Sequence, residues 1–123
     1  AFWARIFEFR LRGRSDSMAF IDMGDQFLNL STGRSRGPDG DRHFGLVVDD
    51  KDAVRRRLDE LGIELLAGRG IDFLDPWGNR IQIVDYREVQ YTKTPGILAW
   101  MGLGRLGKNP DAETEIAEKF RRD

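Results

Sequence analysis

The segment Asp75-Pro76-Trp77-Gly78-Asn79 has the composition of a tight turn, and it decides how the chain around it folds. Pro76 presets φ for a turn, Gly78 or Asn79 can take the left-handed conformation, and the carboxylate of Asp75 can accept backbone N–H groups ahead of it. We therefore predict that this segment reverses the chain between two strands. Backbone geometry explains its residue types, so we interpret the turn as structural.

The residues on either side of the turn have the patterns of β-strands. Ile71 to Leu74 is short and apolar, and it is bounded by turn residues. Arg80 to Tyr86 alternates, which places Ile81 on one face of the strand and both Arg80 and Gln82 on the opposite face. The two segments predict a pair of adjacent strands.

A strand and a helix precede this pair. His43 to Val48 is mostly apolar and partly β-branched, which predicts a strand buried on at least one face. Asp50 then caps a helix that Gly62 ends. The inner face of this helix carries Val54, Leu58 and Leu61. With Ile63 to Leu66 predicted as a short strand, Arg42 to Tyr86 becomes one β-α-β-β-β unit.

The first 31 residues repeat this design in shortened form. Trp3, Ile6 and Phe7 have the spacing of a helix end. Strands are predicted at Phe9–Leu11, Ala19–Asp22 and Gln26–Ser31. The segment 20–25 aligns with 73–79 if one gap is allowed, which gives a strand-turn-strand repeat. Two similar modules are expected, the first lacking its opening strand and most of its helix.

The remaining segments connect and extend these modules. Thr32 to Asp41 is rich in Gly, Ser, Arg and Asp, as expected of a linker or a lid, with Arg34 and Arg36 solvated. In the tail, Asn109 and Pro110 predict the cap and first residue of a final helix. Its inner face is expected to carry Ile116 and Phe120. The predicted organisation is a domain at 1–90, with module one at 1–31, the linker at 32–41 and module two at 42–86, then a helical extension at 91–123.

Composition excludes several classes of function. The 123 residues carry 20 basic and 21 acidic side chains mixed along the chain, so no basic face is expected to bind nucleic acid. The absence of cysteine excludes disulfides, thiolate nucleophiles and sulfur-ligated zinc. No apolar stretch approaches the roughly 20 residues that span a bilayer. We expect a cytoplasmic protein without membrane or nucleic-acid partners.

The two modules and their motifs resemble the vicinal oxygen chelate superfamily, the group of glyoxalases, bleomycin-resistance proteins and extradiol dioxygenases. The resemblance covers about residues 2 to 90 and rests on His43-Phe44-Gly45-Leu46-Val47-Val48-Asp49 and on Phe73-Leu74-Asp75-Pro76-Trp77-Gly78-Asn79-Arg80-Ile81. It implies an α+β fold in which paired βαβββ modules form a cupped mixed sheet around one site. It also implies a homodimer.

In the resembled families a divalent metal is held by residues of the first and last strands of each module. His43 matches the His of that pattern, whereas the position of the family's Glu falls on Gln82. The corresponding residue of module one is Asn29 or Leu28, depending on the gap. Divalent cations gain much of their affinity from anionic oxygen, which these side chains lack. With one His in the chain, a site of two His and one carboxylate cannot be built either.

Two functional hypotheses follow. The first is a small organic molecule bound in the cupped sheet by His43, Gln82, Arg80 and Asn29, with no cofactor or only a weakly held divalent metal. The alternative is a divalent-metal-dependent lyase or isomerase of the glyoxalase type, with His43 and Gln82 as metal ligands. Each of these polar residues could instead be a solvated residue of a sheet face. A third hypothesis is subunit contact through the apolar residues Trp100, Met101 and Leu103.

Overall fold

The computed structural model describes residues 1–121. Its elements in chain order are α1 (Phe2–Ile6), β1 (Arg10–Arg14), β2 (Met18–Asp22), β3 (Phe27–Ser31), β4 (His43–Val48), α2 (Lys51–Glu60), β5 (Ile71–Leu74), β6 (Arg80–Asp85), α3 (Pro95–Trp100) and α4 (Pro110–Lys119).

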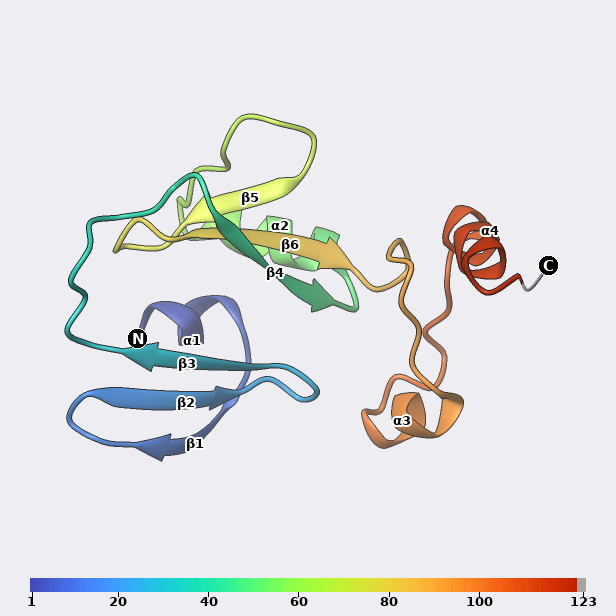
Figure 1. The fold of residues 1–123 in the computed structure, drawn as a ribbon, viewed down its shortest axis with the longest axis horizontal. Coiled ribbons are helices and arrows are strands. Elements are labelled where there is room, and N and C mark those ends of the chain that lie inside the picture. Colours follow the sequence, from blue (N-terminus) through green and yellow to red (C-terminus); the bar gives the residue numbers. More distant parts are fainter. Residues whose placement is uncertain (122–123) are drawn as a thin grey trace.

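Two three-stranded sheets form the body of the molecule (Figure 1). In sheet one, β2 lies between β1 and β3 and is antiparallel to both. In sheet two, β6 lies between β4 and β5, parallel to β4 and antiparallel to β5. A parallel pair needs a long crossover, which contains α2 here. The predicted α+β fold of paired modules is confirmed. In the described part of the chain, sheet one has no strand at the place that β4 takes in sheet two.

Module two follows the predicted local rules closely. The carboxylate of Asp50 caps α2 by accepting from the backbone N–H groups of Asp52 and Ala53, at 3.0 and 3.1 Å. Strand β6 alternates between half-buried and buried positions, as its sequence predicts. The predicted strand at 63–66 is wrong, because the segment contributes only one bridge, between Leu65 and Phe73.

Asp85 ties the end of β6 to the start of α2. Its carboxylate is 1% exposed and accepts from the guanidinium of Arg87 at 2.7 and 2.8 Å and from the backbone N–H of Lys51 at 3.1 Å. The hydrogen bonds from Arg87 lower the pKa of Asp85 to about 2, and the burial of the carboxylate opposes the shift.

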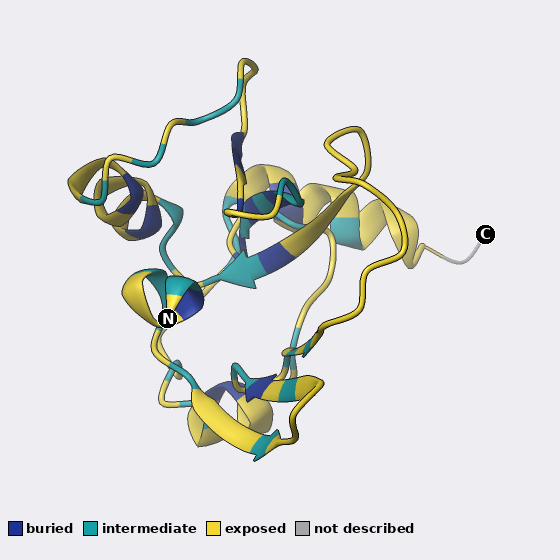
Figure 2. Ribbon diagram, turned by 90° about the vertical axis from the view of Figure 1, so that its left-hand side faces the viewer, coloured by how far each residue is buried: buried dark blue, intermediate teal, exposed yellow. Residues whose placement is uncertain are grey.

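One hydrophobic core serves both modules. Most of it belongs to module two, where Leu58, Phe73 and Ile81 have no exposed surface. Module one contributes Trp3 from α1 and Ile21 from β2, each 3% exposed. In Figure 2 the buried segments lie where the sheets and helices face one another, and the outer parts of the strands are exposed.

The side chain of Gln26 links the two sheets by hydrogen bonds. The amide of Gln26, in the turn between β2 and β3, donates to the carbonyl of Val47 at 2.7 Å and accepts from its N–H at 2.9 Å. Val47 lies on β4, which is an edge strand. Gln26 therefore satisfies both backbone groups of one edge residue, as a neighbouring strand would.

The tail forms a lobe beside the body (Figure 1) and is attached around Tyr86. The ammonium of Lys108 lies 3.6 Å from the centre of the Tyr86 ring and donates to the carbonyls of Tyr86 and Val89. The Tyr86 hydroxyl accepts from the N–H of Lys93 at 2.9 Å. Burial lowers the pKa of Lys108, and its cationic neighbour Lys93 acts in the same direction. No helix in this described chain is long and apolar enough to cross a membrane.

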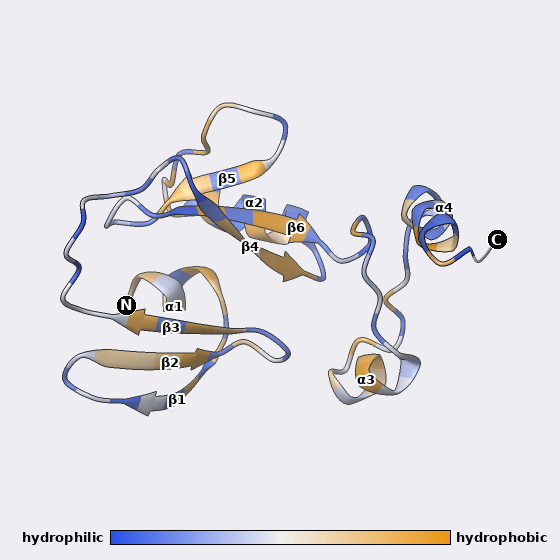
Figure 3. Cartoon of the chain, in the orientation of Figure 1, coloured by the Kyte–Doolittle hydropathy of each residue, from blue (hydrophilic) through white to orange (hydrophobic). Residues whose placement is uncertain are grey.

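The two tail helices differ in how well they were predicted. Asn109 caps α4 as expected, accepting from the N–H of Ala112 at 2.8 Å. The inner-face placement of Phe120 is wrong, because its side chain is 67% exposed and Ala112 is the buried residue of this helix. Helix α3 was not predicted as a helix. Thr94 caps it and Pro95 is its first residue, and Figure 3 shows it as one of the more hydrophobic segments.

Candidate functional site

The exposed face of sheet two brings three of the four candidate residues together. Neighbouring residues in the strand register point to the same side of the sheet. His43 on β4 is paired with Arg80 on β6, and Gln82 lies between Gly45 on β4 and Asp72 on β5. The opposite face, with Leu46 and Ile81, enters the core. His43, Arg80 and Gln82 therefore share the face that does not pack inside the protein.

Arg80 is not a free cation on this face. Its guanidinium donates to one carboxylate oxygen of Asp72 through Nε at 2.9 Å and through Nη2 at 2.6 Å. Asp72 is 6% exposed, so the pair is shielded from water on the carboxylate side. The charge of Arg80 is thus compensated within the sheet, and the carboxylate of Asp72 is occupied by its partner.

Gln82 and His43 are the polar groups of this face that remain available. Gln82 is half-buried, and His43 is exposed. Gly45 is the neighbour of Gln82 on β4, and a Cβ built there would lie 4.0 Å from the Gln82 Oε1 atom. Because Gly45 has no side chain, the amide of Gln82 is left uncovered on that side. A ligand can meet one amide and one imidazole here.

These donors do not fit a tightly bound divalent metal. At the positions that the resemblance assigns to ligands, the chain carries an imidazole and amides, without an anionic oxygen. Asp72 is the carboxylate beside Gln82, and Arg80 already binds it. Within residues 1–121 no group of three or more His, Cys, Asp or Glu side chains is arranged to hold a metal ion.

Asn29 is placed on sheet one, apart from the other three candidates. It is exposed on β3 and pairs in register with Phe20 on β2. The alignment of the two modules left Asn29 and Leu28 as alternatives for the residue that corresponds to Gln82. Leu28 faces the other way and packs against the core. Of the two residues, Asn29 is therefore the one on the open face.

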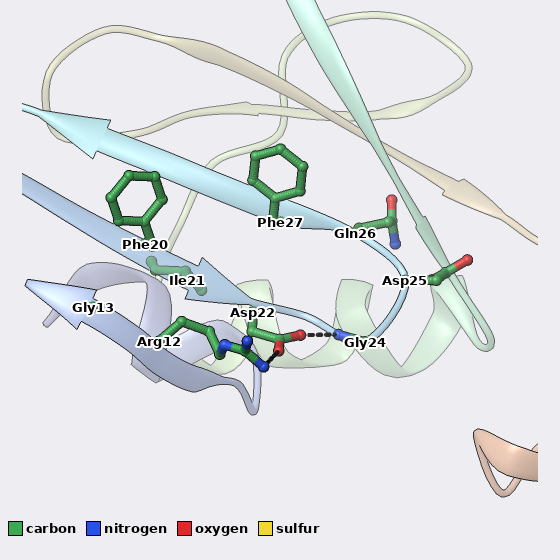
Figure 4. Close-up of a pocket in the computed structure, with 9 residues that line it drawn as sticks. All are labelled: Arg12, Gly13, Phe20, Ile21, Asp22, Gly24, Asp25, Gln26 and Phe27. Carbon is green, nitrogen blue, oxygen red and sulfur yellow. Dashed lines mark hydrogen bonds and ion pairs between the residues drawn. The ribbon is translucent and has the colours of Figure 1, made fainter.

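The open face of sheet one also contains a pocket that the sequence did not predict (Figure 4). The cavity has a volume of about 570 Å³ and lies between Arg12, Phe20, Asp22 and Phe27, among others. Phe20 is 38% exposed and Phe27 is 73% exposed, and the Arg12 guanidinium contacts the Asp22 carboxylate at 3.4 Å. Strand parity could have placed the two rings on one side, but it does not say which side of the sheet stays open.

The turn after β5 is structural, as predicted. The carboxylate of Asp75 is 8% exposed and accepts from the N–H groups of Trp77 and Asn79, at 3.0 and 2.8 Å, and from the Asn79 amide at 2.6 Å. The linker packs on this turn, because Arg34 donates to the carbonyl of Trp77 at 2.8 Å and to the side chain of Asn79. Arg34 is exposed, as predicted, and its guanidinium also binds this turn.

Comparison with known proteins finds relatives by fold. No protein-family model and no curated protein sequence matches the chain. Lactoylglutathione lyase from Agrobacterium tumefaciens aligns with a TM-score of 0.57 and 21% identity, over 70% of this chain and 81% of its own. A bleomycin-binding protein solved with bleomycin aligns with a TM-score of 0.52 and 18% identity, over 68% of this chain and 83% of its own. The fosfomycin resistance protein FosX from Mesorhizobium loti aligns with a TM-score of 0.52 and 20% identity, over 67% of this chain and 75% of its own.

Identities near 20% establish the fold alone. The sequence-based resemblance is thus confirmed at the level of architecture: this chain has the fold of the vicinal oxygen chelate superfamily.

Proposed function

We propose that this protein binds a small organic molecule on the exposed face of sheet two, without a tightly held metal. The observation that carries the proposal is that the half-buried amide of Gln82 and the exposed imidazole of His43 lie on the same face of sheet two, which the core does not use. Neighbours of the same fold include a protein solved with bleomycin, which supports a ligand of this kind.

The chemistry of the face favours a polar, uncharged contact. Gln82 offers one acceptor and a donor group, and His43 offers a donor or an acceptor according to its tautomer. Arg80, held by Asp72, can still present N–H groups that do not face the carboxylate. Asn29 belongs to the same proposed site from sheet one if the ligand extends across both modules. A ligand with hydroxyl or amide groups beside an apolar body matches these residues.

The alternative of a metal-dependent lyase or isomerase has weaker support. Such an enzyme uses its metal as a Lewis acid, which requires ligands that hold the cation firmly. In this chain the carboxylate beside Gln82 is bound by Arg80 at 2.6 Å. A competing cation would have to displace that guanidinium.

We further propose a homodimer that works in the cytoplasm. The exposed apolar residues of the tail and of sheet one support association between copies, because isolated chains rarely leave so many large side chains in water. The experiment below uses the full chain and does not depend on the oligomeric state.

Amide spectra can test the ligand site directly. The full chain, labelled with ¹⁵N, is titrated with metal-free bleomycin, fosfomycin and a library of small polar organic molecules. We expect at least one compound to shift the side-chain amide of Gln82 and the backbone amides around His43, and Gln82→Ala to weaken its binding at least about tenfold. Val84→Thr, on the same strand, is the control. The absence of any saturable shift at Gln82 and His43 across the library would contradict the proposal.

A further inference from the structure

A second cavity lies at the junction between the tail and the two modules, and we call it the junction pocket. Its volume is about 460 Å³, within the range of about 300–1,000 Å³ that is typical of small-molecule sites. Sheet two contributes Leu46 and Val48 of β4 to its lining. Side chains alternate along a strand, so these two lie on the face opposite to His43. The junction pocket is therefore separate from the ligand site proposed above.

The other apolar walls of the junction pocket come from module one and from the tail. These wall residues are all half-buried: Phe7, Met23, Met101, Leu103 and Leu106. The tail reaches the turn between β2 and β3 (Figure 1), where a Cβ built on Gly24 would lie 3.6 Å from the Met101 Cε atom. Such walls can bury the apolar body of an organic molecule, and methionine side chains adapt to different shapes.

The junction pocket contains more negative than positive charge. Its lining includes the three carboxylates of Glu8, Asp25 and Asp49, and the ammonium of Lys93. Lys93 forms an ion pair with Asp25. Glu8 and Asp49 are exposed, and neither forms an ion pair with another residue in the range 1–121. Two carboxylates of this cavity can therefore bind a further cation.

Lys93 shows how the junction pocket accommodates an ammonium group. Its side chain is half-buried, and its Nζ atom contacts the Asp25 carboxylate and lies 5.7 Å from the centre of the Tyr86 ring. Tyr86 also lines the cavity. A carboxylate and an aromatic face are groups that stabilise an ammonium out of bulk water. The position of the chain's own cation is thus an observation, separate from the two unpaired carboxylates, that the pocket suits positive charge.

We propose that the junction pocket is a second binding site, for a small molecule with an apolar body and one ammonium group. The body lies between Met23 of module one and Met101 of the tail, and the ammonium donates to Glu8 or Asp49. An anion is disfavoured because it would meet two unpaired carboxylates. The site depends neither on the ligand proposed for sheet two nor on the oligomeric state.

Methionine methyl signals can test this site, because the chain has three methionines and two of them line the pocket. The full chain, labelled with ¹³C at the methionine methyl groups and with ¹⁵N, is titrated near neutral pH with hexylamine, cyclohexylmethylamine and 4-phenylbutylamine. We expect at least one amine to give saturable shifts at Met23 and Met101 and none at Met18, the internal control. No saturable shift at Met23 and Met101, or shifts confined to the amides of Gln82 and His43, would overturn the proposal.

The charges of the ligand and of the protein are then changed separately. The neutral 4-phenylbutan-1-ol and the anionic 4-phenylbutyrate should bind at least about tenfold more weakly than 4-phenylbutylamine. Glu8→Gln with Asp49→Asn should weaken binding of the amine at least about tenfold and leave the weaker binding of the alcohol unchanged, because the apolar walls stay intact.

A matched variant controls for the overall charge of the protein. Asp16→Asn with Glu64→Gln removes the same charge from two exposed positions outside the pocket and should leave the affinity for the amine unchanged. Equal affinities for the amine and the alcohol, or an equal loss in this control variant, would overturn the assignment of an ammonium ligand. The amide titration of Gln82 reports separately on the site proposed on sheet two.

Discussion

The two modules share a plan but differ in how much of their apolar surface they bury. In module two, Phe73 and Leu58 are fully buried between α2 and sheet two. In module one, Phe20 and Phe27 occupy strands of similar pattern and remain exposed. The difference arises because Phe73 lies on the face of sheet two that packs into the core, whereas Phe20 and Phe27 lie on the face of sheet one opposite to the core-facing Ile21 and Leu28. Strands of similar alternation therefore place their aromatic rings in the core in one module and in solvent in the other.

The largest predicted effect contrasts the phenylalanines of the two modules. Phe73→Ala should lower the free energy of unfolding by about 3–5 kcal/mol, because it leaves a cavity in the shared core. Phe27→Ala, at a ring that is 73% exposed, should change it by less than about 0.5 kcal/mol in the monomer. Denaturant unfolding of dilute protein measures both. Equal losses would contradict the contrast between a closed and an open module.

The second contrast is between the turn after β5 in module two and the corresponding turn after β2 in module one. Asp75→Ala removes an acceptor of three hydrogen bonds from a buried turn and should cost about 2–3 kcal/mol. Its counterpart Asp22 accepts one backbone N–H, that of Gly24 at 3.0 Å, beside an exposed arginine. Asp22→Ala should cost about 1 kcal/mol or less. Thermal unfolding of the two variants is the measurement, and a larger loss for Asp22→Ala would reverse the ranking.

Much of module two could be predicted because its signals are local. The cap at Asp50, the alternation of β6 and the turn at Asp75 are each decided by a few adjacent residues. The segment around Leu65 was overpredicted, since a strand forms only where a partner lies alongside. Helix α3 was missed, although Pro95 stands at its first position and proline is favoured in the first turn of a helix.

The candidate sites depend on contacts between segments that are distant in the sequence. Such contacts could not be predicted from local sequence patterns. Alternation alone placed Arg80 and Gln82 on one face, but it could not reveal that Asp72 would bind Arg80. Nothing in the linker sequence indicates that Arg34 reaches Trp77. The pocket of sheet one was missed for a similar reason, because an apolar residue on a strand is normally expected to lie in the core.

Protonation of Asp85 in module two should contribute to the unfolding of the protein by acid. Asp85 has a folded pKa of about 2 against an ordinary value of 3.8, so its contribution is present above the unfolded pKa and is lost as the pH falls through the folded one. That contribution is about 2 kcal/mol. The stability difference between the wild type and Asp85→Asn should therefore shrink as the pH falls from about 6 to about 2. Urea unfolding across this range measures it, and a constant difference would exclude the role assigned to Asp85.

The smallest effect concerns the bridge between the modules. Gln26→Ala removes both side-chain hydrogen bonds to Val47 and should cost about 1 kcal/mol. Because β4 is an edge strand, the Val47 amide should then exchange with solvent faster, while the Leu46 amide should be less affected. Hydrogen exchange followed by NMR tests this, and unchanged protection of Val47 would show that the bridge is not maintained in solution.

We propose that the exposed face of sheet two binds an organic ligand and no tightly held metal, because it lacks the anionic donor that a tight metal site needs. Calorimetric titration of the metal-stripped full chain with Mn²⁺, Ni²⁺, Zn²⁺ and Mg²⁺ tests it most directly, with Gln82→Glu titrated in parallel. We predict no stoichiometric tight binding by the wild type and stronger binding by Gln82→Glu, which adds a carboxylate beside His43. Tight binding of one ion per wild-type chain, abolished by His43→Ala, would instead show that this face holds a metal.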